Sequence, residues 1–465
     1  MVNSYYRGFY SGISPDKRLD NRMSNVVIDL VHSGSAIINK TVKNHAPKTA
    51  TYRILNNKRV DYQMVLSGSF RKCAENIDAE HVLCLQDTTE FNLAHIADKV
   101  GKEDLDIGPT TKKEVAGLFC HPVLVCNPSH GAIYGLSSAS IYNRSWGQKD
   151  KYQRNYKSLP IEQKESFRWI ENARNTRSLI DKQVKLTIIG DRESDIYDEF
   201  AEIADETTNL LVRSRVNRNL KSGTGKLHSE LEKQSLAGQV KVDLTGNSSR
   251  AKRTAEIEVR YCKVEIKAPK NYKGISKSQP MYAVQAREVT ANLPAGQQPI
   301  IWRLLTTHAV ESFEQAQQCI EWYKQRWIIE ELFRVIKTKG FQIESTQLGN
   351  GAAIKKLIAF TLEAALQVMQ LKLALDKKQE DKAALIFTDK QIQLLTLLLH
   401  KVEGETAKQK NPYRKNTIAW AAWIIARLGS WTGYKSHGPP GYITIKNGYD
   451  IFHAQYEIFN MLHPE

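Results

Sequence analysis

The stretch YKQRWIIEELFRVIK, from Tyr323 to Lys337, carries the most informative pattern in this 465-residue chain. At about 100° per residue, its aliphatic residues fall on one side and its aromatic and charged residues on the other, which predicts one amphipathic α-helix. The aliphatic side holds Ile328, Ile329, Leu332, Val335 and Ile336, and the polar side holds Tyr323, Arg326, Glu330, Arg334 and Lys337. A solvated helix face with ion pairs such as Glu330 to Arg334 would give the same pattern.

The formal net charge of the chain is +16 at neutral pH. Two segments carry this excess: residues 1–61 hold 10 Lys/Arg against 4 Asp/Glu, and residues 213–278 hold 16 against 6. Such segments favour a polyanionic partner such as nucleic acid, although they can also serve solubility alone. The remainder of the chain is close to neutral.

The sequence favours a cytoplasmic location and argues against a membrane partner. The N-terminal MVNSYYRGFYSG lacks the apolar run of a secretory signal. The most apolar segment, Ile358–Leu375, contains Glu363, Gln367, Gln370 and Lys372, which is more typical of a buried bundle helix than of a membrane span. The six cysteines form no CxxC pair, so we expect reduced core residues and no structural zinc site.

We predict an α/β catalytic region between two helical regions. Residues 1–61 form a basic helical domain suited to DNA, in which DKRLDNRMSNVVIDLVHSGSA is a helix with apolar residues Met23, Val26, Val27 and Leu30. Residues 62–375 form the α/β domain, with a basic β insertion at about 217–299 where apolar residues alternate with period two. Residues 376–465 are helical again, with helices expected at Thr388–Lys401, Asn416–Leu428 and Tyr449–Phe459.

Two apolar strands of the α/β region end in aspartate. HVLCLQD ends at Asp87, and VKLTIIGD ends at Asp191 before SDIYDEFAEIA, a predicted helix with Ser194 as its N-cap. Two carboxylates at strand ends and Glu330 on a later helix are what a two-metal phosphoryl-transfer site needs, since Mg²⁺ and Mn²⁺ offset the repulsion between carboxylates. Either aspartate alone could simply bond a turn.

The spacing Tyr-xx-Arg-xxx-Glu-xxxxxx-Lys, filled by Tyr323, Arg326, Glu330 and Lys337, resembles the signature helix of bacterial DDE transposases. QDTTEF around Asp87 and GDRESDIY around Asp191 are similar to the other two motifs of the cut-and-paste transposases found in composite transposons. Similar stretches near Arg53, Arg213, Trp302 and Arg427 extend the resemblance over nearly the whole length.

This resemblance implies a ribonuclease H-like core with Asp87, Asp191 and Glu330 as catalytic, metal-binding residues for two Mg²⁺ ions, for which Mn²⁺ can substitute. It also implies contacts to double-stranded DNA, both transposon ends and target. The implied DNA-binding residues are Tyr323, Arg326, Lys337, Trp302, Arg213, Arg215, Arg22, Arg53 and Arg334. Trp302 would occupy the gap left by a flipped base.

The implied reaction is hydrolytic nicking, hairpin formation, hairpin opening and strand transfer, carried out by a homodimer whose contacts come from the C-terminal helices. A catalytically silent DNA-binding regulator or inhibitor of transposition is the alternative from another class. A metal-dependent nuclease without strand transfer would share the three carboxylates but would not need the pair Tyr323 and Trp302.

Overall fold

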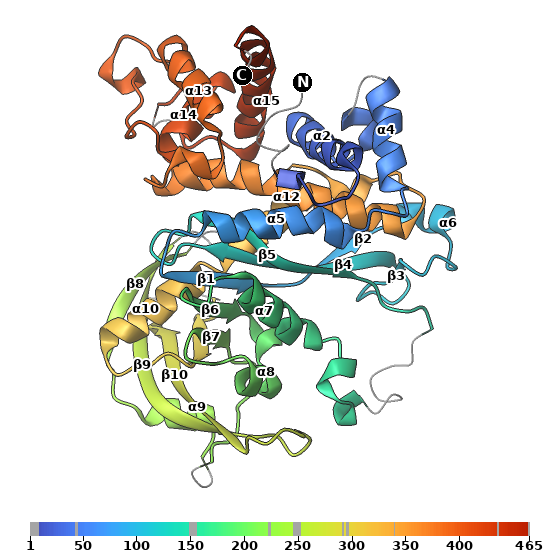
Figure 1. The fold of residues 1–465 in the computed structure, drawn as a ribbon. Coiled ribbons are helices and arrows are strands. Elements are labelled where there is room, and N and C mark those ends of the chain that lie inside the picture. The colour runs from blue at the N-terminus through green and yellow to red at the C-terminus, as the bar shows by residue number, and fades with distance from the viewer. Residues whose placement is uncertain are drawn as a thin grey trace. The chain divides into compact units, whose positions relative to one another are not determined.

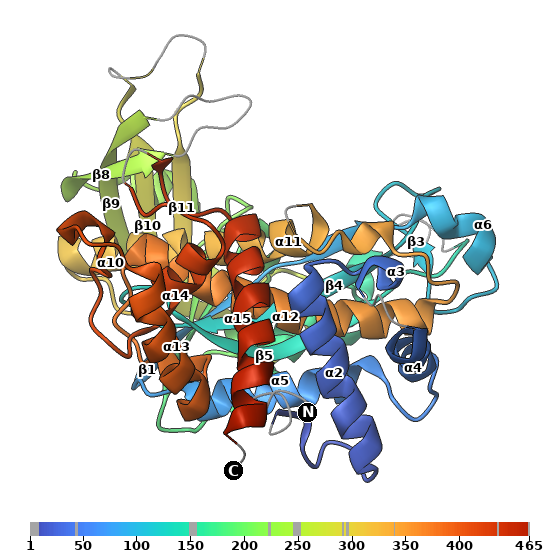
Figure 2. The same cartoon turned by 90° about the horizontal axis from the view of Figure 1, so that it is seen from above.

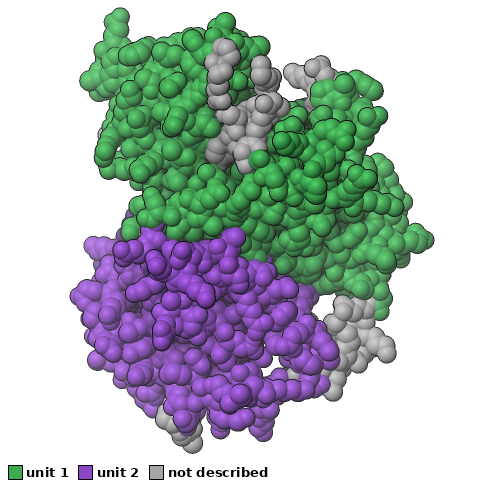
Figure 3. All heavy atoms as spheres, in the orientation of Figure 1, with its two compact units in different colours: residues 1–78, 88–148, 328–465 green, residues 79–87, 149–327 purple. Residues whose placement is uncertain are grey.

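The computed structural model forms two compact units (Figure 3). Unit 1 comprises residues 1–78, 88–148 and 328–465, and unit 2 comprises residues 79–87 and 149–327. Each unit is therefore assembled from separate pieces of the chain, and the division into three domains stays a prediction. The described residues are 9–41, 45–147, 156–221, 225–244, 253–290, 293, 297–338, 340–434 and 437–463.

Unit 2 is built on strands in the order β1-β6-β7-β11-β10-β9-β8, of which Figure 1 labels all but β11, labelled in Figure 2. β1, β6 and β7 are parallel to one another, and the later strands pair antiparallel. The strand bounds are β1 His81–Gln86, β6 Lys185–Gly190, β7 Thr208–Arg213, β8 Gly238–Leu244, β9 Arg253–Lys267, β10 Ser278–Glu288 and β11 Ile301–Thr306. β6, one of the two apolar strands predicted to end in aspartate, is buried from Leu186 to Gly190, which is typical of a central strand.

The helices of unit 2 connect these strands. They are α7 Phe167–Leu179, α8 Tyr197–Glu202, α9 Leu227–Lys233 and α10 Phe313–Lys324, with short 3₁₀ turns η2 Tyr156–Ser158, η3 Ile161–Gln163 and η4 Arg192–Ser194. β8, β9 and β10 confirm the predicted β insertion in its described residues, while α9 was not predicted. The parts of the insertion that lie outside the described residues are 222–224, 245–252, 291–292 and 294–296. Both α9 and α10 pack on β9 and β10.

Unit 1 contains its own antiparallel strands and most of the helices. β4 Ala116–Cys126 pairs with β2 Thr89–Asn92, β3 Gly108–Pro109 and β5 Ile133–Tyr142. The turn between β4 and β5 contains Gly131, whose φ of +70° is in the left-handed region that favours glycine. The first helices are α2 Lys17–Ser33, α3 Ile38–Thr41, α4 His45–Leu55 and α5 Tyr62–Asn76, followed by η1 Ala94–Ile96 and α6 Ala97–Val100. Together the units give the mixed α/β class that was predicted.

The long apolar helix α12, Gly351–Lys377, is the centre of the helical part of unit 1. It packs against α2, α5, α14 Ile418–Leu428 and α15 Tyr442–Leu462 (Figures 1 and 2). Its length and hydropathy would suffice to cross a membrane, but 89% of its most apolar window is buried inside the structure. The expectation of a buried bundle helix is confirmed. The remaining elements are η6 Ile343–Ser345, η7 Ala383–Leu385, α13 Asp389–Val402 and η8 Ala407–Gln409.

Several helix boundaries follow their capping residues. The side chain of Asp16 accepts a hydrogen bond at the start of α2, and Thr388 and Thr417 do the same for α13 and α14. The predicted apolar residues of α2 are all buried. α15 begins at Tyr442, seven residues before the predicted start at Tyr449.

The stretch from Tyr323 to Lys337 is not one helix, which corrects the prediction. α10 ends at Lys324, and α11 runs from Trp327 to Lys337. Between them, the N–H groups of Gln325 and Arg326 donate to carbonyls three residues back at 3.0 and 3.1 Å, the tighter 3₁₀ pattern. The stretch contains no Gly or Pro to signal this break. The aliphatic side of α11 is buried as predicted.

Candidate active site

Asp87 and Asp191 directly follow neighbouring parallel strands of unit 2. The register of β1 and β6 runs from His81 opposite Lys185 to Leu85 opposite Ile189, a constant offset of 104 residues. The same offset separates Asp87 from Asp191, so continuation of the register places the two aspartates side by side. Neighbouring strands lie about 4.8 Å apart. The fold thus brings together two carboxylates that lie far apart in the sequence.

The segment after Asp191 is fixed by buried polar contacts. The carboxylate of Asp191 accepts a hydrogen bond from the N–H of Glu193 at 2.7 Å, so it also caps η4, as the turn alternative proposed. The predicted N-cap role of Ser194 is wrong: α8 begins at Tyr197, and Ser194 instead donates its hydroxyl to Glu199 at 2.7 Å. Glu199 is buried, which raises its pKa to about 8. The Ser194 hydroxyl therefore bonds a buried carboxyl group and does not cap α8.

Asp87 is held by Arg326. The guanidinium Nη1 of Arg326 lies 2.8 Å from Oδ2 of Asp87, and the two side chains are only 10% and 18% exposed. Arg326 occupies the turn between α10 and α11, with its guanidinium 5.9 Å from the ring centres of both Tyr323 and Trp327. This ion pair joins two of the predicted site residues.

The remaining predicted residues of unit 2 surround Tyr323. The Trp302 ring, on β11, meets the Tyr323 ring edge-on at a centroid distance of 5.8 Å. Burial raises the pKa of the Tyr323 hydroxyl; the charges of Arg326 and Arg213 oppose this shift and that of Asp191 adds to it. Arg213 also has a lowered pKa, chiefly through burial. Unit 2 therefore gathers one cluster, hereafter the carboxylate–arginine cluster: Asp87, Asp191, Arg213, Trp302, Tyr323 and Arg326.

Asp195 is a residue that sequence reasoning missed. Its buried carboxylate accepts hydrogen bonds from the N–H groups of Arg215 and Val216 at 2.7 and 3.1 Å and from Nε of Arg218 at 2.6 Å. The segment that follows β7 is thereby fixed, and the side chain of Arg215 is left exposed. The available signal was a carboxylate four residues after Asp191 that precedes the basic stretch RSRVNR.

The other half of the signature lies in unit 1, on α11. Lys337 bonds the backbone carbonyl of Glu90, lies 4.0 Å from Glu344, and has a pKa lowered mainly by burial. The exposed Arg334 pairs with Glu331 at 2.8 Å. Glu330 is half-buried on the same helix. Its grouping with the two aspartates stays a prediction.

Two predicted DNA-binding arginines lie on the N-terminal helices of unit 1. Arg22 is half-buried on α2, where its charge opposes the rise, caused by burial, in the pKa of Asp29 to about 6. Arg53 is exposed near the end of α4. Arg53 is therefore free to reach a phosphate without first uncovering buried surface.

The carboxylate–arginine cluster fits a divalent cation by its donor chemistry. Among the described residues, no group of three or more His, Cys, Asp or Glu side chains has the spacing of a metal site. The strand-end aspartates nevertheless supply two hard oxygen donors on a rigid sheet edge, which are the ligands that Mg²⁺ and Mn²⁺ take. Asp87 and Asp191 could therefore hold such a cation.

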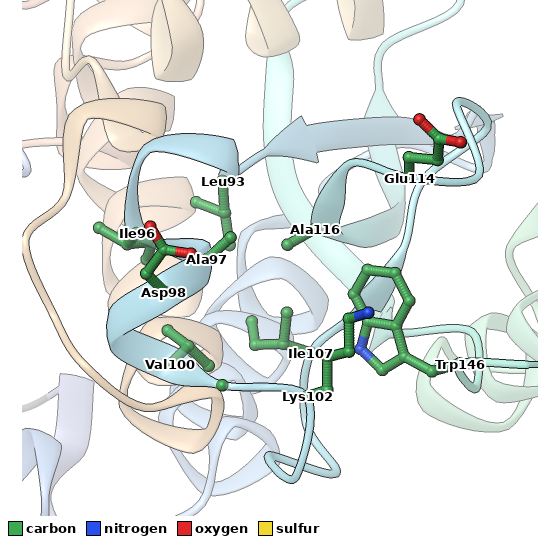
Figure 4. A pocket seen from close by; sticks show the side chains of 11 residues that line it. Leu93, Ile96, Ala97, Asp98, Val100, Lys102, Ile107, Glu114, Ala116 and Trp146 are labelled. Atoms are coloured by element: carbon green, nitrogen blue, oxygen red, sulfur yellow. The ribbon is translucent and has the colours of Figure 1, made fainter.

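A separate pocket of about 220 Å³ lies within unit 1 (Figure 4). Its walls are largely apolar, and Lys102 lies 5.8 Å from the Trp146 ring centre. The lining residues include Leu93, Ile96, Val100, Ile107 and Ala116. None of the residues predicted for catalysis or DNA binding lines it.

Residues 163–366 match the protein-family model described as the transposase DDE domain. The match covers less than half of the chain but includes Asp191, Glu330 and the cluster residues from Arg213 to Arg326; it begins after Asp87. It supports a transposase of the DDE type, a class with metal-dependent chemistry and DNA as its partner.

Proposed function

We propose that this protein is a cut-and-paste DNA transposase that binds the ends of its element, excises it and joins it to target DNA. The observation that carries the proposal is the parallel register of β1 and β6, which Asp87 and Asp191 directly follow, together with the arginine and aromatic side chains near them. The match to the transposase DDE domain supports it.

Asp87, Asp191 and Glu330 are the proposed ligands of two Mg²⁺ ions, with Mn²⁺ as a substitute. Bound cations of this kind neutralise charge at the phosphate and activate the attacking oxygen. The rigid strand ends fix the two aspartates, and α11 supplies the glutamate.

The proposed DNA contacts divide by chemistry. Arg326 and Arg213 present guanidinium groups beside Tyr323, suited to phosphate oxygens. Trp302 offers a ring face to a base that leaves the stack. The other proposed contacts are the exposed Arg215, Arg334 and Arg53 and the half-buried Arg22 and Lys337.

Each proposed step exchanges one phosphorus–oxygen bond for another. Water attacks the phosphorus at the element's end and releases a 3′-hydroxyl. That hydroxyl attacks the opposite strand to form a hairpin, which a second water opens. The freed 3′-hydroxyls then attack phosphates of the target. We propose that a homodimer, formed through the C-terminal helices, performs these steps at the bacterial nucleoid.

A cleavage assay tests this function. The substrate is a duplex that carries the element's terminal repeat, incubated with Mg²⁺ or EDTA and resolved on a denaturing gel. We expect Mg²⁺-dependent nicks followed by a hairpin-length product, and none with Glu330→Ala. Glu331→Ala is the matched control, since it removes the neighbouring carboxylate, which pairs with Arg334, from the same helix.

The other readings predict different products. Tight end binding without a nick, in Mg²⁺ and Mn²⁺ alike, would identify a silent regulator. Nicks without joining to a target plasmid would identify a nuclease. Equal loss of cleavage in both glutamate variants would contradict the specific role of Glu330.

A further inference from the structure

The position of the ion pair between Arg326 and Asp87 suggests a function in addition to local stabilisation. Arg326 is in neither helix: it lies in the short turn between α10 and α11, and its side chain is almost fully buried. A guanidinium cannot lose its proton under ordinary conditions, so its charge always needs an anion or water. In this structure the carboxylate of Asp87 is one such partner, at 2.8 Å.

The cluster already contains cationic groups in this state. Arg326 pairs with Asp87, and Arg213 carries a second guanidinium, on which the charges of Arg192 and Arg326 also act. A divalent cation on Asp87 would add two positive charges at the position that the guanidinium now holds. Like charges a few ångströms apart repel strongly even where the surrounding protein and water screen them. The cation and the guanidinium therefore compete for one carboxylate.

We propose that Arg326 is the counter-ion of the metal-free site: it holds Asp87 until a divalent cation takes that carboxylate, and its displaced guanidinium then binds a DNA phosphate. This inference rests on the proposed function. It makes Arg326 a positioning residue whose partner changes with the state of the site. Metal binding and DNA-end binding then favour each other.

The surroundings of Arg326 offer a second position for its guanidinium. The buried Tyr323 ring and the Trp327 ring both lie 5.9 Å from it, and Trp327 is 51% exposed. A guanidinium that leaves Asp87 can thus remain against an aromatic face while it turns toward solvent. A phosphate beside the exposed Trp327 ring could then pair with the Arg326 guanidinium while α10 and α11 remain intact.

The coupling has a defined sign. Without DNA, the cation must displace Arg326 and lose the free energy of the ion pair. With a phosphate present, Arg326 already has another partner, so the cation binds more tightly. By linkage, the cation tightens DNA binding by the same factor.

Mn²⁺ binding to the full-length, DNA-free protein tests the competition, measured by electron paramagnetic resonance of free Mn²⁺. Arg326→Gln should lower the Kd for Mn²⁺ by about tenfold, because the competing charge is gone. Asp87→Asn should raise it. A merely structural role for Arg326 would leave the Kd unchanged or raise it.

Arg253→Gln is the matched control. Arg253 is also an arginine of unit 2 that pairs with a carboxylate: its side chain is 13% exposed and lies 2.8 Å from Glu288, but it belongs to the β insertion. The same change of charge there should leave the Kd for Mn²⁺ as in the wild type. If Arg253→Gln lowered the Kd for Mn²⁺ as much as Arg326→Gln, the loss of one positive charge anywhere in unit 2 would explain the effect, and the proposal would be overturned.

The wild type provides a test that needs no folded variant. A duplex carrying the terminal repeat should lower its Kd for Mn²⁺, and Arg326→Gln should largely abolish this coupling. Absence of coupling in the wild type overturns the counter-ion role while the site and proposed function stand. If Asp87→Asn leaves Mn²⁺ binding intact, the metal site itself fails, and the proposed function with it.

Discussion

The hydroxyl of Ser194 donates a hydrogen bond to the buried carboxyl of Glu199 at 2.7 Å. Ser194 lies three residues after the catalytic candidate Asp191. Burial raises the pKa of Glu199 to about 8, while Ser194 opposes and Asp195 adds to the shift. The carboxyl group is therefore protonated in the folded protein at neutral pH. A neutral acid is thus hydrogen-bonded to η4, the turn that follows Asp191.

This arrangement predicts a pH-dependent stability. An unfolded glutamate ionises near pH 4.5, so the contribution of Glu199 is fully present below that pH and is lost as pH rises toward 8. Glu199→Gln replaces the carboxyl with a neutral amide of similar shape. At pH 8 its free energy of unfolding should exceed that of the wild type by at least about 1 kcal/mol, with little difference at pH 4. Urea unfolding at both pH values measures this, and equal differences at both would refute it.

Loss of Asp195 should destabilise the protein strongly. Asp195→Ala leaves the buried Arg218 without its carboxylate and frees the backbone of Arg215 and Val216, at a cost of about 3–5 kcal/mol. Arg174→Ala, which breaks the half-exposed pair with Glu202, should cost under about 1 kcal/mol. Denaturant titration compares the two. Similar losses would mean that Asp195 does not organise this segment.

Trp302 should affect hairpin formation more than nicking. If its ring stacks on a flipped base, Trp302→Ala should slow the conversion of nicked DNA to hairpin about tenfold and leave the first nick within about twofold. Trp302→Phe keeps an aromatic face and should restore much of the rate. Time courses on denaturing gels separate the steps. An equal loss in both steps would assign Trp302 to general DNA binding.

End binding should depend steeply on salt, and exposed arginines should set the slope. Arg53→Ala should reduce the slope of log K against log salt concentration by about one, since one phosphate contact is lost. Arg18→Ala is the control, because Arg18 is 90% exposed but is already paired with Asp16 at 3.0 Å. Fluorescence anisotropy over a salt series measures both. A slope that neither variant changes would place the interface elsewhere.

The sequence was most informative where one local pattern decides the outcome. The apolar runs before Asp87 and Asp191 predicted buried strands, and both are found. The predicted ranges Thr388–Lys401 and Asn416–Leu428 agree with α13 and α14 to within about two residues. These features depend on neighbours in the chain, so they can be inferred without the fold.

Features that depend on distant partners were not predictable. The break at Arg326 has no Gly or Pro to mark it, and Arg326 pairs with Asp87, 239 residues earlier. Ser194 fits the pattern of an N-cap, yet the buried Glu199 takes its hydroxyl. In both cases a buried charge or acid, invisible in a linear pattern, decides the local conformation.

The buried helix α12 also has a consequence for synthesis of the protein. α2 and α4 precede residue 56, but part of the surface on which they pack belongs to α12, residues 351–377. At ribosomal rates of about 5–20 residues per second, the completed α2 waits roughly 15–60 s for this partner. During that interval the basic N-terminal helices expose Met23, Val26 and Leu30, so the nascent chain should be a client of chaperones until α12 emerges.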